Sequence, residues 1–426
     1  MTLTQGLFGD PELGGVMETP AQLSAMLRAE AALARVQGEL GIIPQDAAAA
    51  IARIAEGLVL DPDSLIAATA TAGIAAQALA GALKSACGEH GQWAHFGATS
   101  QDIQDTGLVL QLVQALRIIQ TRLDDVIAVL AAKADEYADQ PIPARTRYQI
   151  AAPTTLGAKI AVWRAPLLRH LERLDELRPR VLNVSLYGAA GTGAALAPRM
   201  AEVRHAMAAQ LGLGAPDIPW HSTRDVIAEL GGWLALVTGS LGKIGADLIL
   251  LGQSEIAEVS AGTGGGSSTM PQKSNPVAAE ALVSLARLNA GAVGPLYQAM
   301  VHAQERDGAA LALEWHTLPE MIIRTGAALR LALALAKTIA PRPDRIAETF
   351  ARDRGAMLAE AAGFYLARQM PRPEALKIVA AALAEVAASD TETLAGALTR
   401  LAPGHDWVQI IALGTNTGDA AWQARN

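Results

Sequence analysis

A glycine-rich run followed by hydroxyl, lysine and Asn-Pro residues is the part of this sequence with the clearest chemical meaning. It reads Gly262-Thr-Gly-Gly-Gly-Ser-Ser-Thr-Met-Pro-Gln-Lys-Ser-Asn-Pro276. Glycine reaches positive φ and reorganises at low cost, which suits a loop that opens and closes over a ligand. Lys273 adds a positive charge, and Asn275-Pro276 predicts a helix start whose free N–H groups attract anions. The spacing predicts a mobile lid over an anion site, with a serine as nucleophile or base.

A phosphate loop, a dinucleotide turn and a plain linker all fit this run less well. A phosphate-binding loop needs Gly-Lys before its Ser or Thr, whereas this chain has Gln272-Lys273. A dinucleotide-binding turn follows a strand, whereas an apolar helix is predicted here. A flexible linker has no need of the Met-Pro-Gln-Lys-Ser-Asn-Pro sequence after its glycines. The lid is therefore the favoured interpretation.

Two further segments carry polar groups at close spacing. The first is His95-Phe-Gly-Ala-Thr-Ser-Gln-Asp102, in which Thr99, Ser100 and Asp102 also suit a helix cap. Taken alone, the cap is the better interpretation, and the lid makes a binding role the better one. The second is Arg145-Thr-Arg-Tyr-Gln149, followed by Ala152-Pro-Thr-Thr-Leu-Gly157.

Long helices are expected to position these segments. Apolar residues recur at helical spacing over five stretches, and no stretch alternates convincingly enough to be a sheet. The stretches are 106–139, 153–180 with a continuation to 211, 223–259, 276–303 and 316–339. Such helices cannot bury all their apolar faces in one thin subunit, so self-association into a bundle is expected.

Composition limits the function classes. The 426 residues are 51% hydrophobic and carry a net charge of −8, with no basic stripe, so a nucleic-acid partner is not expected. Cys87 is the only cysteine, is expected in the core, and suits a cytoplasmic location without disulfides. No secretory signal is visible at the N-terminus. The apolar window from Gly231 to Gly252 contains Lys243 and Asp247, which favours a buried helix over a membrane span. No metal-ligand spacing and no cofactor are indicated.

The lid closely resembles the signature of the fumarase/aspartase superfamily, Gly-Ser-Ser-x-Met-Pro-x-Lys-x-Asn-Pro. The resemblance implies that Ser267 moves a proton alpha to a carboxylate, and that Lys273 and Asn275 hold that carboxylate. The segments around His95 and Arg145 resemble two other shared regions, and His221 and Arg306 fall at superfamily site positions. The substrate-binding residues so implied are His95, Thr99, Ser100, Arg145, Arg147, Gln149, Thr154, His221, Lys273, Asn275 and Arg306. The lid and its support comprise Gly264, Gly265, Gly266, Ser268, Met270 and Glu280.

Arg147 departs from the superfamily pattern Arg-Thr-His-Gly-Gln. It stands where adenylosuccinate lyase has the histidine that protonates the leaving group, and an arginine does not give up a proton at ordinary pH. A carboxylate needs no such acid to leave or attack. The substitution suits a reaction in which a carboxylate adds to a double bond, as in the superfamily branch of 3-carboxy-cis,cis-muconate cycloisomerases. That branch also resembles this chain at Leu7-Phe-Gly-Asp10, Trp220-His-Ser-Thr-Arg-Asp225 and Glu314-Trp-His-Thr-Leu-Pro-Glu320.

The resemblance implies an all-α fold with three helical domains. These are residues 1–106, a central long-helix bundle over 107–345 with the lid at 260–275, and a smaller domain over 346–426. It also implies a homotetramer with shared active sites and a small tricarboxylate substrate, without membrane or nucleic-acid partners. Two alternatives remain: another lyase of the superfamily, such as adenylosuccinate lyase, and a non-catalytic helical scaffold that retains the fold.

Overall fold

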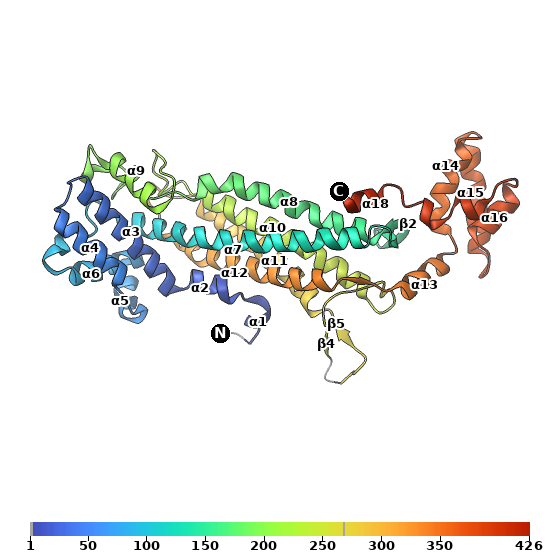
Figure 1. Cartoon of the computed structure of the whole chain (residues 1–426), viewed down its shortest axis with the longest axis horizontal. Helices are drawn as coiled ribbons and strands as arrows, with labels where there is room; N and C mark the ends of the chain where they lie inside the picture. The colour runs from blue at the N-terminus through green and yellow to red at the C-terminus, as the bar shows by residue number, and fades with distance from the viewer. Residues whose placement is uncertain (1–2, 267–268) are drawn as a thin grey trace. The chain divides into compact units, whose positions relative to one another are not determined.

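The fold is built from α-helices, as the composition predicts. The computed structural model describes residues 3–266 and 269–426. Its five longest helices are α7 (Ser100–Glu136), α8 (Leu156–Val181), α10 (Asp225–Gly252), α11 (Val277–Ala299) and α12 (Gly308–Thr338). They fall on the five predicted stretches, with one difference: α8 ends at Val181, and the continuation to residue 211 is a separate helix, α9 (Met200–Leu211). Figure 1 labels these elements along the chain.

The chain divides into two units, and each long helix contributes a segment to both. The first unit comprises Met1–Leu123, Arg169–Gly239 and Ser284–Arg330, and the second comprises Asp124–Leu168, Ser240–Val283 and Leu331–Asn426.

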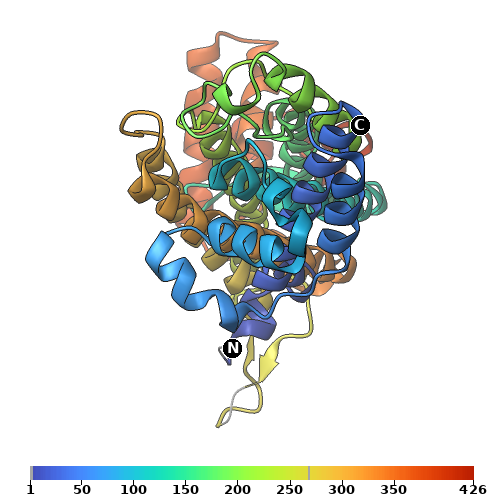
Figure 2. The ribbon, with the colours of Figure 1, turned by 90° about the vertical axis from the view of Figure 1, so that its left-hand side faces the viewer.

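Short and medium helices form the beginning of the first unit (Figure 2). They are α1 (Gln5–Phe8), α2 (Pro11–Met17), α3 (Thr19–Glu39), α4 (Gln45–Gly57), α5 (Pro62–Ala72), α6 (Ala75–Ala86) and the 3-10 helix η1 (Gly88–Trp93). A Cβ atom at Gly38 of α3 would collide with the side chain of Ala48 of α4, so glycine allows these two helices to approach closely. Met26, Leu33 and Leu79 lie in their shared core, and Cys87 is buried beside it, as predicted.

The long helices pack side by side in the first unit through buried polar contacts. Asn289 of α11 donates to Thr325 Oγ1 of α12 at 3.1 Å, and Trp233 Nε1 of α10 donates to the His170 carbonyl of α8 at 3.0 Å. All four residues are buried. Directed hydrogen bonds of this kind fix the register of one helix against the next.

The same helices pack again in the second unit. Gly157 at the start of α8 leaves no room for a Cβ atom, because the backbone of Ala134 in the last turn of α7 and of Ala138 just after it lies against Gly157. Trp163 Nε1 of α8 donates to Asp247 Oδ2 of α10 at 2.7 Å. The close backbone contact at Gly157 therefore fixes the packing of α8 against α7, and the indole hydrogen bond fixes α8 against α10.

A β-hairpin precedes α8, and here the prediction that no stretch forms a sheet is wrong. β1 (Pro141–Thr146) pairs antiparallel with β2 (Gln149–Thr155), and Thr146 faces Gln149 across the turn. The two turn residues, Arg147 and Tyr148, have φ of 50° and 69°. A two-residue turn with positive φ at both positions matches the right-handed twist of hairpin strands, although Asn and Gly usually fill it. Prolines at the start of β1 and in β2 hide the strand pattern.

The C-terminal helices of the second unit enclose a small core of their own. They are α13 (Pro343–Asp353), η3 (Ala356–Leu358), α14 (Ala359–Ala367), α15 (Arg372–Ala387), α16 (Leu394–Leu401), α17 (Trp407–Ile410), η4 (Leu413–Thr415) and α18 (Ala420–Arg425). Leu366, Leu398 and Trp407 are buried together there, and Trp407 Nε1 donates to the Ala402 carbonyl at 2.9 Å. The division into three domains stays a prediction.

A short 3-10 helix and two pairs of two-residue strands are the remaining elements of the described residues. The 3-10 helix η2 (Ala194–Leu196) lies between α8 and α9. β3 (Val259–Ser260) pairs with β6 (Ala340–Pro341), and β4 (Gly265–Gly266) pairs with β5 (Ser274–Asn275). The last pair forms the base of the predicted lid.

Candidate active site

The buried carboxylate of Asp102 organises the start of α7. Because α7 begins at Ser100, Thr99 is the residue before the helix and Asp102 lies in its first turn. Asp102 Oδ2 accepts from the Thr99 backbone N–H at 3.0 Å, which is one half of a capping box. Asp102 Oδ1 pairs with His221 Nε2 at 2.7 Å and accepts from the Tyr187 N–H at 2.9 Å. The segment therefore starts a helix, as a cap would, and also fixes a predicted site histidine.

Two predicted histidines are each backed by a buried carboxylate. His221 is 3% exposed and contacts Asp102, which is fully buried. His95 Nδ1 contacts Glu30 Oε1 of α3 at 2.5 Å, and Glu30 is 1% exposed. His95 also has φ of 60°, a left-handed backbone conformation that is rare outside glycine. A carboxylate on one ring nitrogen orients the imidazole and sets which nitrogen faces a ligand. Both pairs suit proton transfer or anion binding.

Arg306 reaches this group from the segment between α11 and α12. Its Nε donates to Gln101 Oε1 at 2.7 Å, and its Nη2 donates to the Ala189 carbonyl at 3.0 Å. The side chain is otherwise exposed. The structure thus brings Arg306 to the first turn of α7, within the same unit as Thr99 and His221.

A fully buried charge cluster lies one helical turn further along α7. Arg224 Nη1 and Nη2 donate to the two oxygens of Asp105 at 2.9 and 3.1 Å. On its other side, Arg224 Nη2 donates to Glu314 Oε2 at 2.6 Å, and the guanidinium lies 4.8 Å from the ring centre of Trp220. The paired carboxylates raise the pKa of Arg224 against the opposing effect of burial, and burial raises the pKa of Glu314. The cluster ties α7, the start of α10 and α12 together.

The β1–β2 hairpin carries four predicted site residues in the second unit. Arg145 donates to both oxygens of Glu258 at 2.6 and 2.7 Å, and Glu258 is fully buried. Arg147 lies in the turn and is exposed, Gln149 follows the turn and is exposed, and Thr154 is half-buried on β2. The guanidinium of Arg145 is therefore held by a protein carboxylate, whereas Arg147 stands at the tip of the hairpin.

Lys159 adds positive charge near the base of the hairpin. Burial is the largest effect and lowers the pKa of this half-buried ammonium; the cations Lys243 and Arg145 lower it further, while Asp247 and Glu258 oppose the shift. Counting Lys159 itself, three cations face two carboxylates, and this excess positive charge suits an anionic ligand.

The base of the lid is a two-residue β ladder. Gly265 pairs with Asn275 and Gly266 pairs with Ser274, while the Lys273 N–H donates to the Met270 carbonyl at 3.0 Å. Gly264 has φ of 67°, and a Cβ atom there would collide with the Ser274 hydroxyl, so glycine is required. Because α11 begins at Val277, Asn275 lies in β5 and is not the helix cap that Asn275-Pro276 predicts.

Other predicted lid residues have different settings. Met270 and Lys273 are exposed, and Glu280 is an exposed residue in the first turn of α11. The predicted proton-transfer residue Ser267 and its neighbour Ser268 lie outside the described residues. Their roles stay predictions.

The predicted site residues thus form two groups, one in each unit. His95, Thr99, Ser100, His221 and Arg306 gather around the start of α7, while Arg145, Arg147, Gln149, Thr154 and the lid belong to the second unit. The polar residues that support the first group, such as Glu30 and Gln101, were not predicted from sequence. Glu30 had a detectable signal, because it stands between the apolar residues Met26 and Leu33 on one face of a helix.

Metal binding has no support in the described part of the chain. No three His, Cys, Asp or Glu side chains within residues 3–266 and 269–426 lie together as a metal site would need. The buried carboxylates named above are engaged by imidazole, guanidinium or backbone N–H groups instead.

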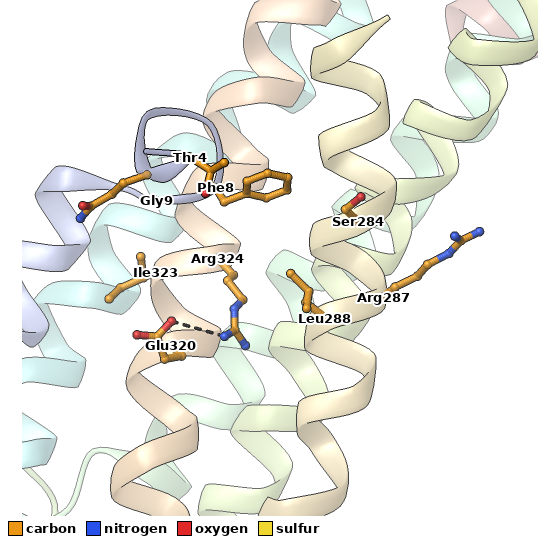
Figure 3. A pocket seen from close by; sticks show the side chains of 10 residues that line it. Thr4, Phe8, Gly9, Ser284, Arg287, Leu288, Glu320, Ile323 and Arg324 are labelled. Carbon is orange, nitrogen blue, oxygen red and sulfur yellow. Dashed lines mark hydrogen bonds and ion pairs between the residues drawn. The ribbon is translucent and has the colours of Figure 1, made fainter. Parts of the chain in front are cut away.

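A pocket of about 820 Å³ lies away from these residues in the first unit. Figure 3 shows Phe8 from the N-terminal segment, Ser284 and Leu288 from α11, and Arg324 paired with Glu320 on α12. The pocket includes none of the predicted site residues. Its size alone is therefore no argument for catalysis.

Comparison with known proteins identifies the family. A family model described as lyase matches residues 12–290, which is more than half of the chain. The chain belongs to this lyase family. The predicted membership of the fumarase/aspartase superfamily is thereby confirmed, and with it the all-α fold.

Several members of the family resemble the chain over most of its length. A 3-carboxy-cis,cis-muconate cycloisomerase of Pseudomonas aeruginosa is 42% identical, covering 88% of this chain and 84% of the relative. An N-acetyl-S-(2-succino)cysteine lyase of Enterococcus italicus is 34% identical, covering 89% of this chain and 84% of the relative. The crystal structure of a 3-carboxy-cis,cis-muconate lactonizing enzyme from Pseudomonas putida superimposes with a TM-score of 0.93 at 35% identity, covering 99% of this chain and 97% of that structure.

Proposed function

We propose that this chain is a 3-carboxy-cis,cis-muconate cycloisomerase. It closes a tricarboxylate diene to 4-carboxymuconolactone by adding one of the substrate's own carboxylates across a double bond. The observation that carries the proposal is Arg147, a cation at the exposed tip of the hairpin where an amine-releasing lyase needs a proton donor. The similarity to cycloisomerases at 42% and 35% identity supports the same reaction. The proposed setting is cytoplasmic breakdown of aromatic compounds.

Arg147 suits this chemistry for an electrostatic reason. An amine leaving group must be protonated as it departs, so its elimination requires a general acid. A carboxylate is the anion of an acid with a pKa near 4 and needs no proton to attack or leave. A guanidinium binds such a carboxylate with two parallel hydrogen bonds and keeps its own proton. Arg147 therefore holds the attacking carboxylate.

The lid completes the proposed mechanism on the other side of the double bond. Addition of the carboxylate places negative charge on the carbon alpha to a second carboxylate, giving an aci-carboxylate. Lys273 and Asn275 stabilise this species by fixed charges and hydrogen bonds, and Ser267 delivers the proton to the carbon. In the reverse direction Ser267 is the base. Closure of the lid brings the positive charge of Lys273 beside the serine, and this charge stabilises the serine alkoxide against the opposing effect of burial.

A homotetramer with shared active sites is part of the proposal. Only 28% of the most apolar stretch of α11 is buried within the described chain, and Leu288 and Tyr297 on this helix are 49% and 53% exposed. A helix that apolar needs a partner surface. Other copies of the chain provide one, because a bundle of long helices buries the same face on every subunit.

A second lyase reaction is the alternative. The relative named N-acetyl-S-(2-succino)cysteine lyase shares 34% identity, and the His95–Glu30 pair offers an acid that Arg147 does not. The alternative predicted from sequence is an elimination that releases fumarate, as in adenylosuccinate lyase. This reaction and lactonisation make opposite demands on Arg147, since only lactonisation uses a permanent cation there.

An absorbance assay separates these functions. Purified protein is mixed with 3-carboxy-cis,cis-muconate, whose conjugation and ultraviolet absorbance are lost when the ring closes. Adenylosuccinate and N-acetyl-S-(2-succino)cysteine are tested in parallel. Loss of absorbance with the muconate supports the proposal, and fumarate release from either other substrate without muconate turnover supports the alternative. Absence of turnover with all three favours the non-catalytic scaffold.

The proton-transfer step has its own test. Ser267→Ala is expected to lower kcat for lactonisation by about a thousandfold, because general acid–base catalysis contributes two to four orders of magnitude. Ser254→Ala, at an exposed serine after α10, serves as the control and keeps the native rate. Near-normal lactonisation by Ser267→Ala would rule out the proposed role of this serine.

A further inference from the structure

We propose that Gln101 is a positioning residue that orients Arg306 toward a substrate carboxylate. The inference rests on the proposed function in one respect: a polycarboxylate is the ligand that Arg306 meets. It adds a residue that neither the lid motif nor the hairpin motif contains. The buried amide of Gln101 makes three hydrogen bonds, one of them to Arg306.

The amide of Gln101 can adopt only one orientation. Gln101 is 1% exposed in the first turn of α7, and its Nε2 donates to the His221 carbonyl at 2.8 Å and to Asp105 Oδ2 at 3.2 Å. Both N–H bonds are thereby used. A flipped amide would place its oxygen against those two acceptors, which is repulsive. The oxygen must therefore face Arg306, whose Nε donates to it at 2.7 Å.

Asp105 is itself held in place, so the orientation does not depend on a mobile partner. Its two oxygens accept from Arg224, which is fully buried and also pairs with Glu314. Buried charge-assisted pairs are shorter and more directional than neutral ones. A continuous set of directed contacts thus runs from Arg224 through Asp105 and Gln101 to the guanidinium of Arg306.

The contacts of Arg306 leave one edge of its guanidinium for a ligand. Nε contacts Gln101 and Nη2 contacts the Ala189 carbonyl, so the Nε–Nη2 edge faces the protein. Among the residues that the structure describes, Nη1 has no acceptor. The Nη1–Nη2 edge has the geometry that binds a carboxylate through two parallel bonds. An exposed arginine samples many rotamers, and fixing Nε removes much of that freedom before the ligand arrives.

Gln101→Met tests this inference, because methionine has a similar length and no hydrogen-bonding amide. The intact protein is titrated calorimetrically with propane-1,2,3-tricarboxylate, a non-reacting tricarboxylate, and KM and kcat for 3-carboxy-cis,cis-muconate are measured beside it. We expect Kd and KM to rise about tenfold or more, because losing a hydrogen bond to a charged group weakens binding by at least that factor. We expect kcat to change little, since Gln101 does not contact the reacting atoms. Gln111→Met is the matched control. It removes a buried glutamine of α7 that donates to the Val16 carbonyl at 2.7 Å, and it should leave Kd unchanged.

A double-mutant cycle separates positioning from general damage. If Gln101 acts through Arg306, Gln101→Met adds nothing to the Kd of Arg306→Met. Arg306→Lys keeps the positive charge but has no Nε, and position 306 is exposed, so this variant should fold. In the Arg306→Lys background, Gln101→Met should also raise Kd only slightly. Full additivity in either background would overturn the inference, as would an unchanged Kd in Arg306→Met.

The two readouts also distinguish this inference from the proposed reaction. If wild-type protein binds the tricarboxylate and the mutant cycle is non-additive, but the muconate is left unchanged, the result supports the positioning role and contradicts the cycloisomerase. If wild-type protein lactonises the muconate but the effects of Gln101→Met and Arg306→Met on Kd are additive, the result supports the reaction and contradicts the positioning role. Failure to bind propane-1,2,3-tricarboxylate at all contradicts the inference.

Discussion

Replacing Arg224 by methionine should destabilise the protein severely. The variant keeps the apolar stem and removes the guanidinium that bridges Asp105 and Glu314, both of which are at most 1% exposed. Breaking one buried ion pair by removing a partner costs about 3–5 kcal/mol, because the remaining charge has neither water nor a counterion. Here two carboxylates lose their cation, so we expect a loss of at least about 4 kcal/mol in the free energy of unfolding at pH 7.

The loss should also depend on pH. Burial already raises the pKa of Glu314 above its ordinary value in the presence of Arg224, and removal of the guanidinium raises it further. A carboxyl group with a raised folded-state pKa keeps a proton that the unfolded chain has released. Stability is therefore lost as the pH rises through that folded-state pKa, and the variant should be closer to wild type at pH 5 than at pH 8.

Urea unfolding followed by circular dichroism measures this effect, at one protein concentration because subunit association changes apparent stability. Arg400→Met is the control: Arg400 also bridges two carboxylates, Glu385 and Glu392, but its side chain is 54% exposed. We expect its unfolding curve to match wild type, as solvent screens exposed pairs. Adding Glu314→Gln to Arg224→Met should recover part of the loss. An Arg224→Met protein that unfolds like Arg400→Met would contradict a stabilising role for the buried cluster, as would a Glu314→Gln change that restores no stability.

Four other variants test separate parts of the structure. Tyr148→Gly should stabilise the protein by about 0.5–1 kcal/mol in urea unfolding, because φ of 69° strains a non-glycine residue, whereas Ile150→Gly in the neighbouring strand should destabilise it. Arg147→Leu should raise KM for the muconate at least about tenfold, since a charge-assisted pair is lost; an unchanged KM would remove Arg147 from the mechanism. Burial and, secondarily, Arg173 lower the pKa of His170 to about 4. The free energy of unfolding should therefore fall as the pH drops from about 6.5 to 4. His170→Leu should remove the contribution of this histidine to the pH dependence of the unfolding free energy, measured across the same range.

Much of the helical fold was predictable, and the hairpin was not. The hydrogen bonds of a helix join residues four apart, and its apolar residues recur every three to four positions. Both features are local in sequence, so the five long helices can be recognised from the sequence pattern. The hairpin contains Pro141, Pro143 and Pro153, and its turn is Arg147-Tyr148 where Asn-Gly is usual. Its pairing is decided by a register between strands, which local propensity does not encode when the turn residues are atypical.

The sequence by itself determined the chemical class of this protein. The predicted lid is a contiguous motif within one segment of the sequence, and the replacement of a superfamily histidine by Arg147 is likewise visible at one position. Neither feature needs knowledge of distant contacts, because the chemistry depends on residue type. These two features led to the family that the comparisons confirm and to the reaction proposed here.

Only the tertiary structure decided which groups form hydrogen bonds to the predicted site residues. Glu30 contacts His95 across 65 residues of sequence, His221 contacts Asp102 across 119, and Arg306 contacts Gln101 across 205. No local pattern links such pairs, because helix packing brings them together. A buried carboxylate or amide must find a partner wherever packing places one. The sequence names the lid and Arg147, and the packing of α3, α7 and α12 determines how the remaining polar groups are held.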